Sequence, residues 1–494
     1  MRRALAAALV ATLVFVVVLA LGAIAIRGGL IGDDALRLWA GASTAADGQV
    51  PVGRIVAAYP TLPFLSSSLL AWLAPASAPA PALVAAGLLA VIAAFCFCSF
   101  CKAGLSEPAA AIFSVLIALH PAMVRAVIAG PSDMFLAAFL LMFCIALYNL
   151  RARSGTSEVM GVGMALMALA FAHPMGAALA FAAVLFLAFA VRPTLVANSA
   201  LNVVVALIFP TIFAIAAFSY VSWVFPGDGW SFFAAPTQSL SVWTVSESHL
   251  FGDAPGKLLS LDASLTMAAA LIAGAPVAVV MLALVYRRRP LLVPAAVFVA
   301  AVIAATAISI VSGFFGTPAA LVVAAPVLAA TVVMRVPLAR QRLALVRALL
   351  LLGWVGGLAS VALVDPAMVS ELHAAVERGS GERVDSLTAG AAADRDDGVL
   401  ADVDNAPAFV LGRGRAKGIF GPQSEAFSLA MLFGRIDAPF VAVPDPQSII
   451  GAEDRINKAF PTLFRNGLAG YRLIYQNNTW KLFGRAKEYA VSKD

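Results

Sequence analysis

Charged residues are scarce in this sequence of 494 residues. Asp, Glu, Lys and Arg make up 12% of the chain, whereas hydrophobic residues make up 62%. A soluble globular protein carries about a quarter charged residues, so the composition excludes an ordinary soluble enzyme. Roughly half of all the charges fall in residues 366–494. The composition therefore divides the chain into a membrane part, 1–365, and a water-soluble part, 366–494.

Cysteine is also rare, and its four occurrences all lie within apolar runs, at Cys96, Cys98, Cys101 and Cys144. A disulfide framework needs cysteines in an oxidising aqueous compartment, so no disulfide or redox function is indicated. The spacing Cys96-x-Cys98-x-x-Cys101 could hold a soft metal. The sequence offers no second ligand cluster, however, and we favour apolar packing.

Motifs for nucleotide binding are missing as well. A transferase that uses nucleotide sugars directly would carry a Gly-rich turn between a strand and a helix, and no such turn occurs. The net charge of +6 does not indicate nucleic-acid binding, because the excess Lys and Arg lie in short clusters between apolar runs. We find no repeat at a fixed period.

Long apolar runs are abundant instead, and about twenty apolar residues suffice to cross a bilayer. Eleven runs qualify, near 4–26, 82–101, 107–129, 133–150, 157–173, 175–191, 199–223, 265–286, 290–313, 317–334 and 344–364. The first is longer than the apolar core of a cleavable signal, so we predict an uncleaved span. The run 61–74 is shorter and is predicted to be a half-helix packed against the bundle. The predicted fold class is a membrane all-α bundle of about 11–13 transmembrane helices with a small C-terminal α/β domain.

The basic residues between these runs predict the side of the membrane that each loop faces. If Arg2 and Arg3 are cytoplasmic and 61–74 does not cross, every other basic cluster is also cytoplasmic, as the positive-inside rule requires. These clusters are Lys102, Arg151 with Arg153, Arg192, Arg287–Arg289, and Arg335, Arg340 and Arg342. The outer face then carries the loop 27–60, the loop 224–264 and the tail. We expect a bacterial inner membrane with a periplasmic tail.

The tail 366–494 is predicted to be a small α/β domain. Helical spacing covers 367–378 and 424–435, and 379–398 has the composition of a polar linker. Strand-like runs lie at 407–412 and 439–444. Residues 471–484 are typical of a hairpin that turns at Asn477-Asn478, which is a better interpretation of this sequence than a glycosylation site.

A few ionisable residues lie at or near membrane depth, where each costs several kcal/mol and is a functional candidate by default. Asp33 and Asp34 follow the first span, Asp133 begins the fourth, and His173 ends the fifth. Arg37 would share a helix face with Asp33 if a helix begins there.

Simpler interpretations of these positions stay open. Asp33, Asp34 and Asp133 also suit helix N-caps, and His173 suits the membrane interface. Arg125, near the outer end of the third span, is as well explained by snorkelling as by phosphate binding.

The order of the motifs carries more information than any single one. Gly32-Asp33-Asp34 follows the first span, Ala58-Tyr59-Pro60 opens the half-helix, and Gly130-Pro131-Ser132-Asp133 opens a later apolar helix. Over about residues 1–190 this order resembles the GT-C superfamily of membrane glycosyltransferases, which includes aminoarabinose and protein-mannosyl transferases. Members transfer a sugar from a polyprenyl-phosphate carrier on the outer face of a membrane.

The resemblance implies roles for these residues. Asp33 or Asp34 would be the catalytic general base of an inverting transfer, and such catalysis contributes about 10²–10⁴-fold. Many members carry a Glu-Lys pair before the prolines, where this chain has Ala57-Ala58. The donor phosphate would then bind an arginine, whose planar fork suits it. The implied substrate-binding residues are Arg37, Arg54, Tyr59, Arg125, Asp133 and His173, and a divalent cation, if the reaction uses one, would take Asp33, Asp34 and Asp133.

The sequence therefore predicts a membrane glycosyltransferase with a lipid-linked donor and an envelope lipid, glycan or protein as acceptor. The alternatives are a polytopic transporter or flippase and a non-catalytic envelope scaffold. A transporter predicts ionisable residues near the midplane and helices broken by Gly or Pro in two repeats. Neither feature is evident from the sequence.

Overall fold

A computed structural model of the protein describes residues 2–27, 33–48, 55, 58–73, 78–153, 155–224, 256–284, 289–312, 315–336, 342–366, 368, 381–393, 398–422 and 424–486. The chain forms two compact units. The first comprises Met1–Ala25, Val56–Pro63 and Ala82–His373, and the second comprises Ile26–Ile55, Phe64–Pro81 and Ala374–Asp494. The composition break near Asp365 thus lies close to the start of the last segment, and two earlier segments belong with it.

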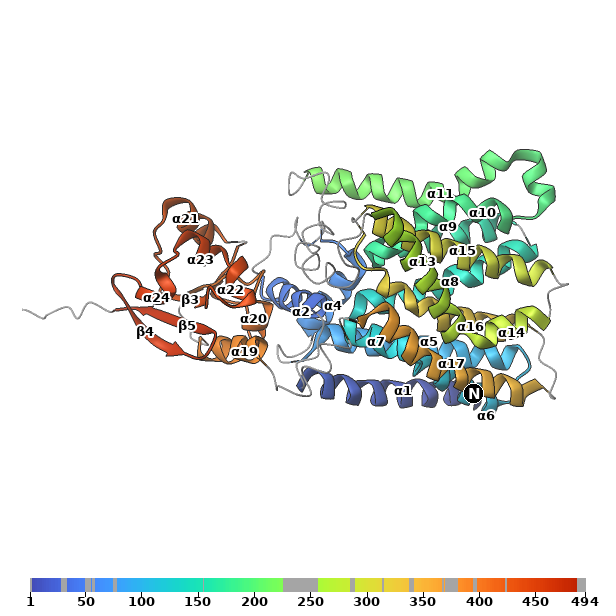
Figure 1. Cartoon of the computed structure of the whole chain (residues 1–494), viewed down its shortest axis with the longest axis horizontal. Coiled ribbons are helices and arrows are strands. Elements are labelled where there is room, and N and C mark those ends of the chain that lie inside the picture. Colours follow the sequence, from blue (N-terminus) through green and yellow to red (C-terminus); the bar gives the residue numbers. More distant parts are fainter. Residues whose placement is uncertain are drawn as a thin grey trace, which may run out of the picture. The chain divides into compact units, whose positions relative to one another are not determined.

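The first unit is a bundle of apolar helices that run side by side (Figure 1). Every one of the eleven apolar runs is helical, as predicted. The helices are α1 (Arg2–Arg27), α5 (Ala80–Lys102), α6 (Glu107–Ala118), α7 (Pro121–Ala129), α8 (Pro131–Arg153), α9 (Thr156–Ala172), α10 (Pro174–Ala190), α11 (Pro193–Val224), α13 (Gly256–Gly274), α14 (Pro276–Leu284), α15 (Arg289–Ser312), the 3₁₀ turn η1 (Pro318–Val323), α16 (Ala324–Arg335) and α17 (Leu343–Val364).

Fewer of these helices reach a full membrane crossing than the eleven predicted. Among the described residues, seven are long and apolar enough to span a membrane, or up to nine if each of two bent helix pairs is one span. Helices α9 and α10 are apolar but have 17 residues each, about 26 Å of helix, against a hydrocarbon core of about 30 Å. The protein is thus mostly helical, with seven to nine candidate spans.

The start of α1 and the turn between α5 and α6 lie at the same end of the bundle. The side chains of Arg2 and Arg3 approach the Glu107 carboxylate at 3.7 and 3.9 Å. The chain must therefore cross an even number of times between these points, and α1 and α5 supply two crossings. This agrees with the prediction that 61–74 does not cross. Helix α4 (Thr61–Leu73) has 13 residues, about 20 Å.

The ends of three further helices meet at this same end. The chain reverses its direction at Gly130, between α7 and α8. The C-terminal end of α8 therefore lies at the same end of the bundle as the start of α6. There Arg335 of α16 donates to Asn149 Oδ1 at 2.7 Å, and Arg151 of α8 donates to the Val191 carbonyl after α10. The bundle thus has a basic end, which is the arrangement that the positive-inside rule predicts.

Two helices of the bundle are broken, which the sequence analysis did not anticipate. The pair α6 and α7 bends by 52° at Leu119-His120, and the pair α13 and α14 bends by 78° at Ala275. Pro121 and Pro276 begin the second half of each pair. A proline is tolerated in the first turn of a helix but interrupts the ladder of a preceding one, so each helix ends just before it.

The second unit contains a five-stranded sheet of order β2-β1-β3-β5-β4. Strand β1 (Val399–Leu400) pairs in parallel with β2 (Ile419–Phe420) and β3 (Phe440–Pro444), whereas β5 (Trp480–Arg485) is antiparallel to β3 and to β4 (Tyr471–Gln476). Its helices are α2 (Asp33–Ala46), most of α4, α19 (Glu382–Ala392), α20 (Pro407–Arg413), α21 (Glu425–Phe433), α22 (Ile449–Glu453), α23 (Arg455–Ala459) and α24 (Leu463–Asn466).

The predictions for the tail are confirmed in part. Strand β3, helix α21 and the hairpin of β4 and β5 lie where they were predicted. The strand predicted at 407–412 is wrong, because these residues form α20, and the linker predicted at 379–398 is wrong, because it contains α19. The two short strands β1 and β2 were not predicted, and most of 367–378 lies outside the described residues.

Helix α2, from the predicted outer loop 27–60, packs on the C-terminal segment of its unit. Ala40 lies in a buried cluster with Phe409 and Trp480. Just after the helix, Asp47 Oδ2 accepts hydrogen bonds from the backbone N–H groups of Ala416 at 2.6 Å and Lys417 at 3.2 Å. The start of the outer loop is therefore built into the domain formed by the tail.

Candidate functional site

The first unit contains a buried cluster of charged side chains around Arg125 of α7. The Arg125 Nη1 atom pairs with Asp133 Oδ2, and Nε and Nη2 reach Asp365 Oδ2 at 2.9 and 2.8 Å. All three side chains are about nine-tenths buried. One guanidinium is thus shared by two carboxylates that lie 232 positions apart in the chain, as the residue numbers show.

The sequence around each carboxylate explains its position. Asp133 lies in the first turn of α8, where the partial positive charge of a helix N-terminus favours an anion. Asp365 caps the C-terminus of α17, where the helix dipole disfavours an anion. Its Oδ1 accepts from the Met368 N–H at 3.2 Å, and Arg125 compensates its charge at Oδ2.

His173 completes the cluster from the junction of α9 and α10. Its Nδ1 accepts the Met175 N–H at 2.9 Å, so the proton of the neutral ring is on Nε2. Nε2 lies 3.1 Å from Asp133 Oδ1 and donates to it. Both oxygens of Asp133 are therefore engaged, one by Arg125 and one by His173.

These contacts gather helix ends at the end of the bundle away from the basic residues. They join the end of α7, the start of α8, the junction of α9 and α10, and the end of α17. The predicted topology puts these points on the outer face. Tyr59 lies close to His173, because its hydroxyl donates to the carbonyl of Ala170, one helical turn before His173, at 2.9 Å.

The other predicted residues belong to the second unit or lie outside the described residues. Asp33 and Asp34 are the first two residues of α2, in the second unit, and their side chains lie outside the described residues. Arg37 is half-buried one turn later in the same helix, and Arg54 lies outside the described residues. Asp365 was predicted only as the boundary of the membrane part, not as a member of this cluster. The available indication was that Asp365 directly follows an apolar run, just as Asp133 lies at the start of one.

Neither a protein-family model nor a curated protein sequence matches the chain. The function must therefore be argued from the residues and their geometry.

A second buried polar group joins the two broken helices. His120 caps the N-terminus of α7, and its Nδ1 accepts the Ala122 N–H at 3.2 Å. Its Nε2 donates to the Gly353 carbonyl of α17 at 3.0 Å and lies 3.2 Å from the Gly274 carbonyl at the end of α13. The imidazole thus satisfies carbonyls at the break of α13 while it occupies the break between α6 and α7.

His120 and His173 have the same local structure. Each precedes a proline, each is the N-cap of the helix that the proline begins, and each accepts a hydrogen bond at Nδ1 from the second residue after it. Both rings must therefore donate through Nε2, which fixes the tautomer. His120 donates to backbone carbonyls, whereas His173 donates to a carboxylate.

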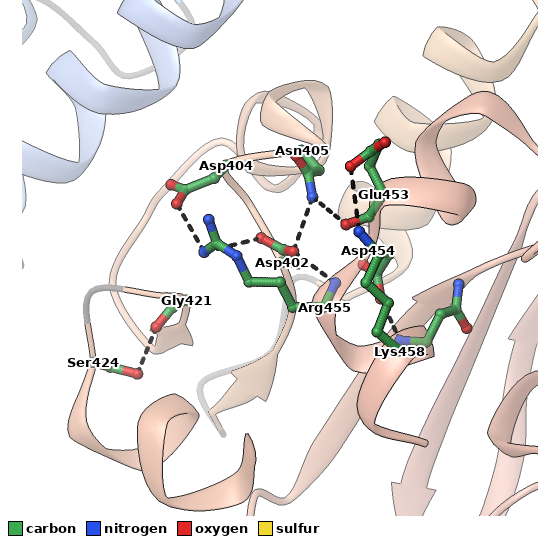
Figure 2. A network of polar contacts seen from close by, with 10 residues as sticks. Asp402, Asp404, Asn405, Gly421, Ser424, Glu453, Asp454, Arg455 and Lys458 are labelled. Atoms are coloured by element: carbon green, nitrogen blue, oxygen red, sulfur yellow. Dashed lines mark hydrogen bonds and ion pairs between the residues drawn. The ribbon is translucent and has the colours of Figure 1, made fainter. Parts of the chain in front are cut away.

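A third polar network lies in the second unit, at the N-terminus of α23 (Figure 2). Asp402 Oδ2 accepts from Asn405 Nδ2 at 3.0 Å and from the Arg455 N–H at 2.9 Å. Asp454 caps the helix through the Asn457 N–H at 2.7 Å. Burial raises the pKa of both carboxyl groups above their usual range, and the charge of Asp402 contributes to raising the pKa of Asp454 to about 7.

No metal centre is evident in the part of the chain that the structure describes, where no group of three or more His, Cys, Asp or Glu is placed to hold an ion. Within these residues Cys96, Cys98, Cys101 and Cys144 are free thiols. Of the three carboxylates that the resemblance offers to a divalent cation, Asp133 already gives both oxygens to protein donors.

Proposed function

We propose that the protein is a membrane glycosyltransferase that transfers a sugar from a polyprenyl-phosphate carrier to an envelope lipid, glycan or protein. The observation that supports this most is the buried cluster of Arg125, Asp133, Asp365 and His173, at the end of the bundle opposite the basic residues. Ionisable groups buried at membrane depth are costly and mark functional sites. This end would face the periplasm if the basic end is cytoplasmic.

The geometry refines the proposed roles. Arg125 is fully engaged by two carboxylates, so the donor phosphate would bind Arg37 or Arg54, and Arg125 would hold the helix ends in place. Asp133 would act in the same way, as an organising residue whose two oxygens are already used. Asp33 and Asp34 remain as the carboxylates for the chemistry and for any divalent cation.

The proposed reaction needs one base and one leaving group. Asp33 or Asp34 would accept the proton of an acceptor hydroxyl or amine as its oxygen or nitrogen attacks the anomeric carbon. The bond from the anomeric carbon to the lipid phosphate breaks, and the phosphate leaves with the bonding electron pair. An arginine would stabilise the charge on that phosphate. Attack opposite the leaving group inverts the configuration at the anomeric carbon.

The test uses purified protein in lipid with a polyprenyl-phosphate sugar as donor. Asp33→Asn and Asp34→Asn should each be compared with Asp437→Asn, an exposed carboxylate of the same unit. We expect at least one of the first two to lose transfer by about 10²-fold or more while the control retains it. Full activity in both would exclude this mechanism.

One observation favours a transporter or flippase as the second candidate. The two broken helix pairs meet at His120, and discontinuous helices around a polar group are typical of transporter binding sites. A flux assay of lipid-linked sugar in liposomes distinguishes the candidates. Movement of the lipid without any transfer, lost in His120→Ala but retained in Asp33→Asn, would favour transport. If neither transfer nor flux is found, the non-catalytic scaffold is the remaining alternative.

A further inference from the structure

Helix α4 carries a stripe of exposed apolar side chains. Leu65, Leu69, Trp72 and Leu73 are exposed by between 42% and 71% of their surface. Their spacing of four, seven and eight residues from the first puts them on one face of an α-helix. All four belong to the second unit, the one that contains the sheet.

The opposite face of α4 is turned inward and is mostly apolar as well. Pro63 and Ser67 are buried there, and Leu70 is half-buried. The first turn of this stretch also lies against α2, since a Cβ atom on Gly41 would be 3.4 Å from the Phe64 ring. A helix on a water-exposed surface buries its apolar face and exposes its polar one. Helix α4 instead exposes an apolar face although its buried face is also mostly apolar.

The composition of α4 is a second indication that the helix does not lie on a surface exposed only to water. The stretch Thr61–Leu73 contains no charged residue. The other exposed apolar helix of the unit, α21, begins with Glu425 behind a Ser424 cap and is followed by Arg435. Charges at both ends keep α21 compatible with water. The last turn of α4 instead holds Trp72, and tryptophan is enriched where a membrane meets water.

The chain also keeps α4 close to a bilayer. Leu73 is seven residues before Ala80, the first residue of α5, which is a candidate span. Seven residues extend at most about 25 Å. The exposed stripe therefore cannot lie further than that from the point where α5 enters the membrane, and the length of α4 is too short to cross.

We infer that the stripe of α4 lies in the lipid bilayer and anchors the second unit to the membrane surface. The occupant is the acyl-chain boundary of the bilayer, with Trp72 at the interface and the face of Ser67 against protein. The unit that contains the predicted soluble domain 366–494 is then a peripheral one, held by its own apolar helix in addition to the connection through α17.

The test measures the collision of a nitroxide label with molecular oxygen, which concentrates in lipid, and with a water-soluble nickel chelate. The label is placed at Leu69→Cys in protein reconstituted into vesicles of phosphatidylethanolamine and phosphatidylglycerol. Cys98 and Cys101 are first replaced by Ala, and the signal of this parent is subtracted because Cys96 and Cys144 are buried. The matched control is Leu432→Cys on α21, an exposed leucine of the same unit.

We expect the ratio of oxygen to nickel collisions to be several times higher at position 69 than at position 432. Leu65→Cys provides a second site if the first variant does not reconstitute. Equal ratios at 69 and 432 would overturn the inference, because the stripe would then face water. Low collision with both reagents at 65 and 69 would overturn it too, because another part of the chain would cover the stripe.

Discussion

Asp454 is fully buried beside Asp402, and its titration makes the stability of the second unit depend on pH. The pKa of its carboxyl is raised from 3.8 to about 7 in the folded protein. The folded state therefore binds a proton that the unfolded state releases between these values. The stabilisation from this proton is complete below about pH 4 and is lost as the pH rises through about 7.

Asp454→Asn should remove this dependence. Asparagine caps a helix as well as aspartate does, so the bond to Asn457 can persist without the buried charge. We expect slower hydrogen exchange in residues 440–460 of the variant than of the wild type at pH 8, and a smaller difference at pH 5. Asp437→Asn, an exposed site, should change exchange at neither pH. Equal protection of wild type and variant at pH 8 would contradict the raised pKa.

The stability of the first unit depends on the charge and shape of the Arg125 side chain. Arg125→Gln leaves Asp133 and Asp365 buried without a cation, and breaking such a pair costs about 3–5 kcal/mol. We expect a clear fall in the thermal unfolding midpoint in detergent. The midpoint of Arg125→Lys should lie between those of the wild type and Arg125→Gln, since a lysine keeps the charge but cannot present the planar fork to two carboxylates.

The control is Arg153→Gln, because Arg153 is exposed and lies 3.9 Å from Glu158. An exposed pair contributes about 0–1 kcal/mol, so this midpoint should barely move. If Arg125→Gln were as stable as Arg153→Gln, the cluster would have no structural role.

Close approach of α17 to the broken helices depends on Gly357. A Cβ atom there would lie 2.6 Å from His120 Cε1, so an alanine must displace the imidazole from the Gly274 and Gly353 carbonyls. We expect Gly357→Ala to lower the unfolding midpoint. Gly87→Ala in α5 is the matched control, because its Cβ would meet nothing within 4 Å. It should be neutral or stabilising, as alanine favours helix more than glycine by about 1 kcal/mol.

The contact between α2 and the loop after α20 depends on Asp47. Asp47→Ala removes the acceptor of two backbone N–H groups at Ala416 and Lys417. We expect faster hydrogen exchange at 415–418 and in α2. Asp47→Asn keeps one side-chain oxygen as an acceptor, so its effect should be smaller. Similar exchange in all three proteins would show that the apolar contact of Ala40 alone positions α2.

Long apolar elements could be predicted from the sequence, and elements whose buried face is made of small residues could not. The apolar runs all form helices because length and composition decide them. In α19 the buried face is Ser386, Ala389 and Gly390, and a Cβ on Gly390 would lie 2.1 Å from the Phe409 carbonyl. Close packing of backbones needs such residues, but they resemble a linker in composition.

Helix α20 was predicted as a strand because Ala-Phe-Val-Leu is a short apolar run, which periodicity alone cannot assign. The residues at its two ends indicate a helix instead. Pro407 occupies the first turn, and Gly414 follows the helix with φ of 73°, the conformation in which glycine ends helices. At the site, the sequence identified Arg125, Asp133 and His173. Their convergence with Asp365 depends on how the helices pack, which no single stretch encodes.

The helical bundle has a basic end and an end with buried acidic residues, and this asymmetry predicts the orientation of the molecule in the membrane. We expect a cysteine at Leu432 to react with a membrane-impermeant maleimide in intact spheroplasts. A cysteine at Lys102 should react only after permeabilisation. Both variants need Cys98 and Cys101 replaced, since Cys98 is exposed. The opposite pattern would reverse the orientation and place the second unit in the cytoplasm.

The hydrogen bond between Asp47 and the Ala416 N–H joins residues 369 positions apart. Ribosomes add about 5–20 residues per second, so α2 waits roughly 20–70 s for the segment that buries Ala40. During synthesis all of the helical bundle except α1 is made between the first and the last segment of the second unit. The order of assembly is thus fixed by the chain: α2 leaves the ribosome among the first helices and is among the last to find its partner.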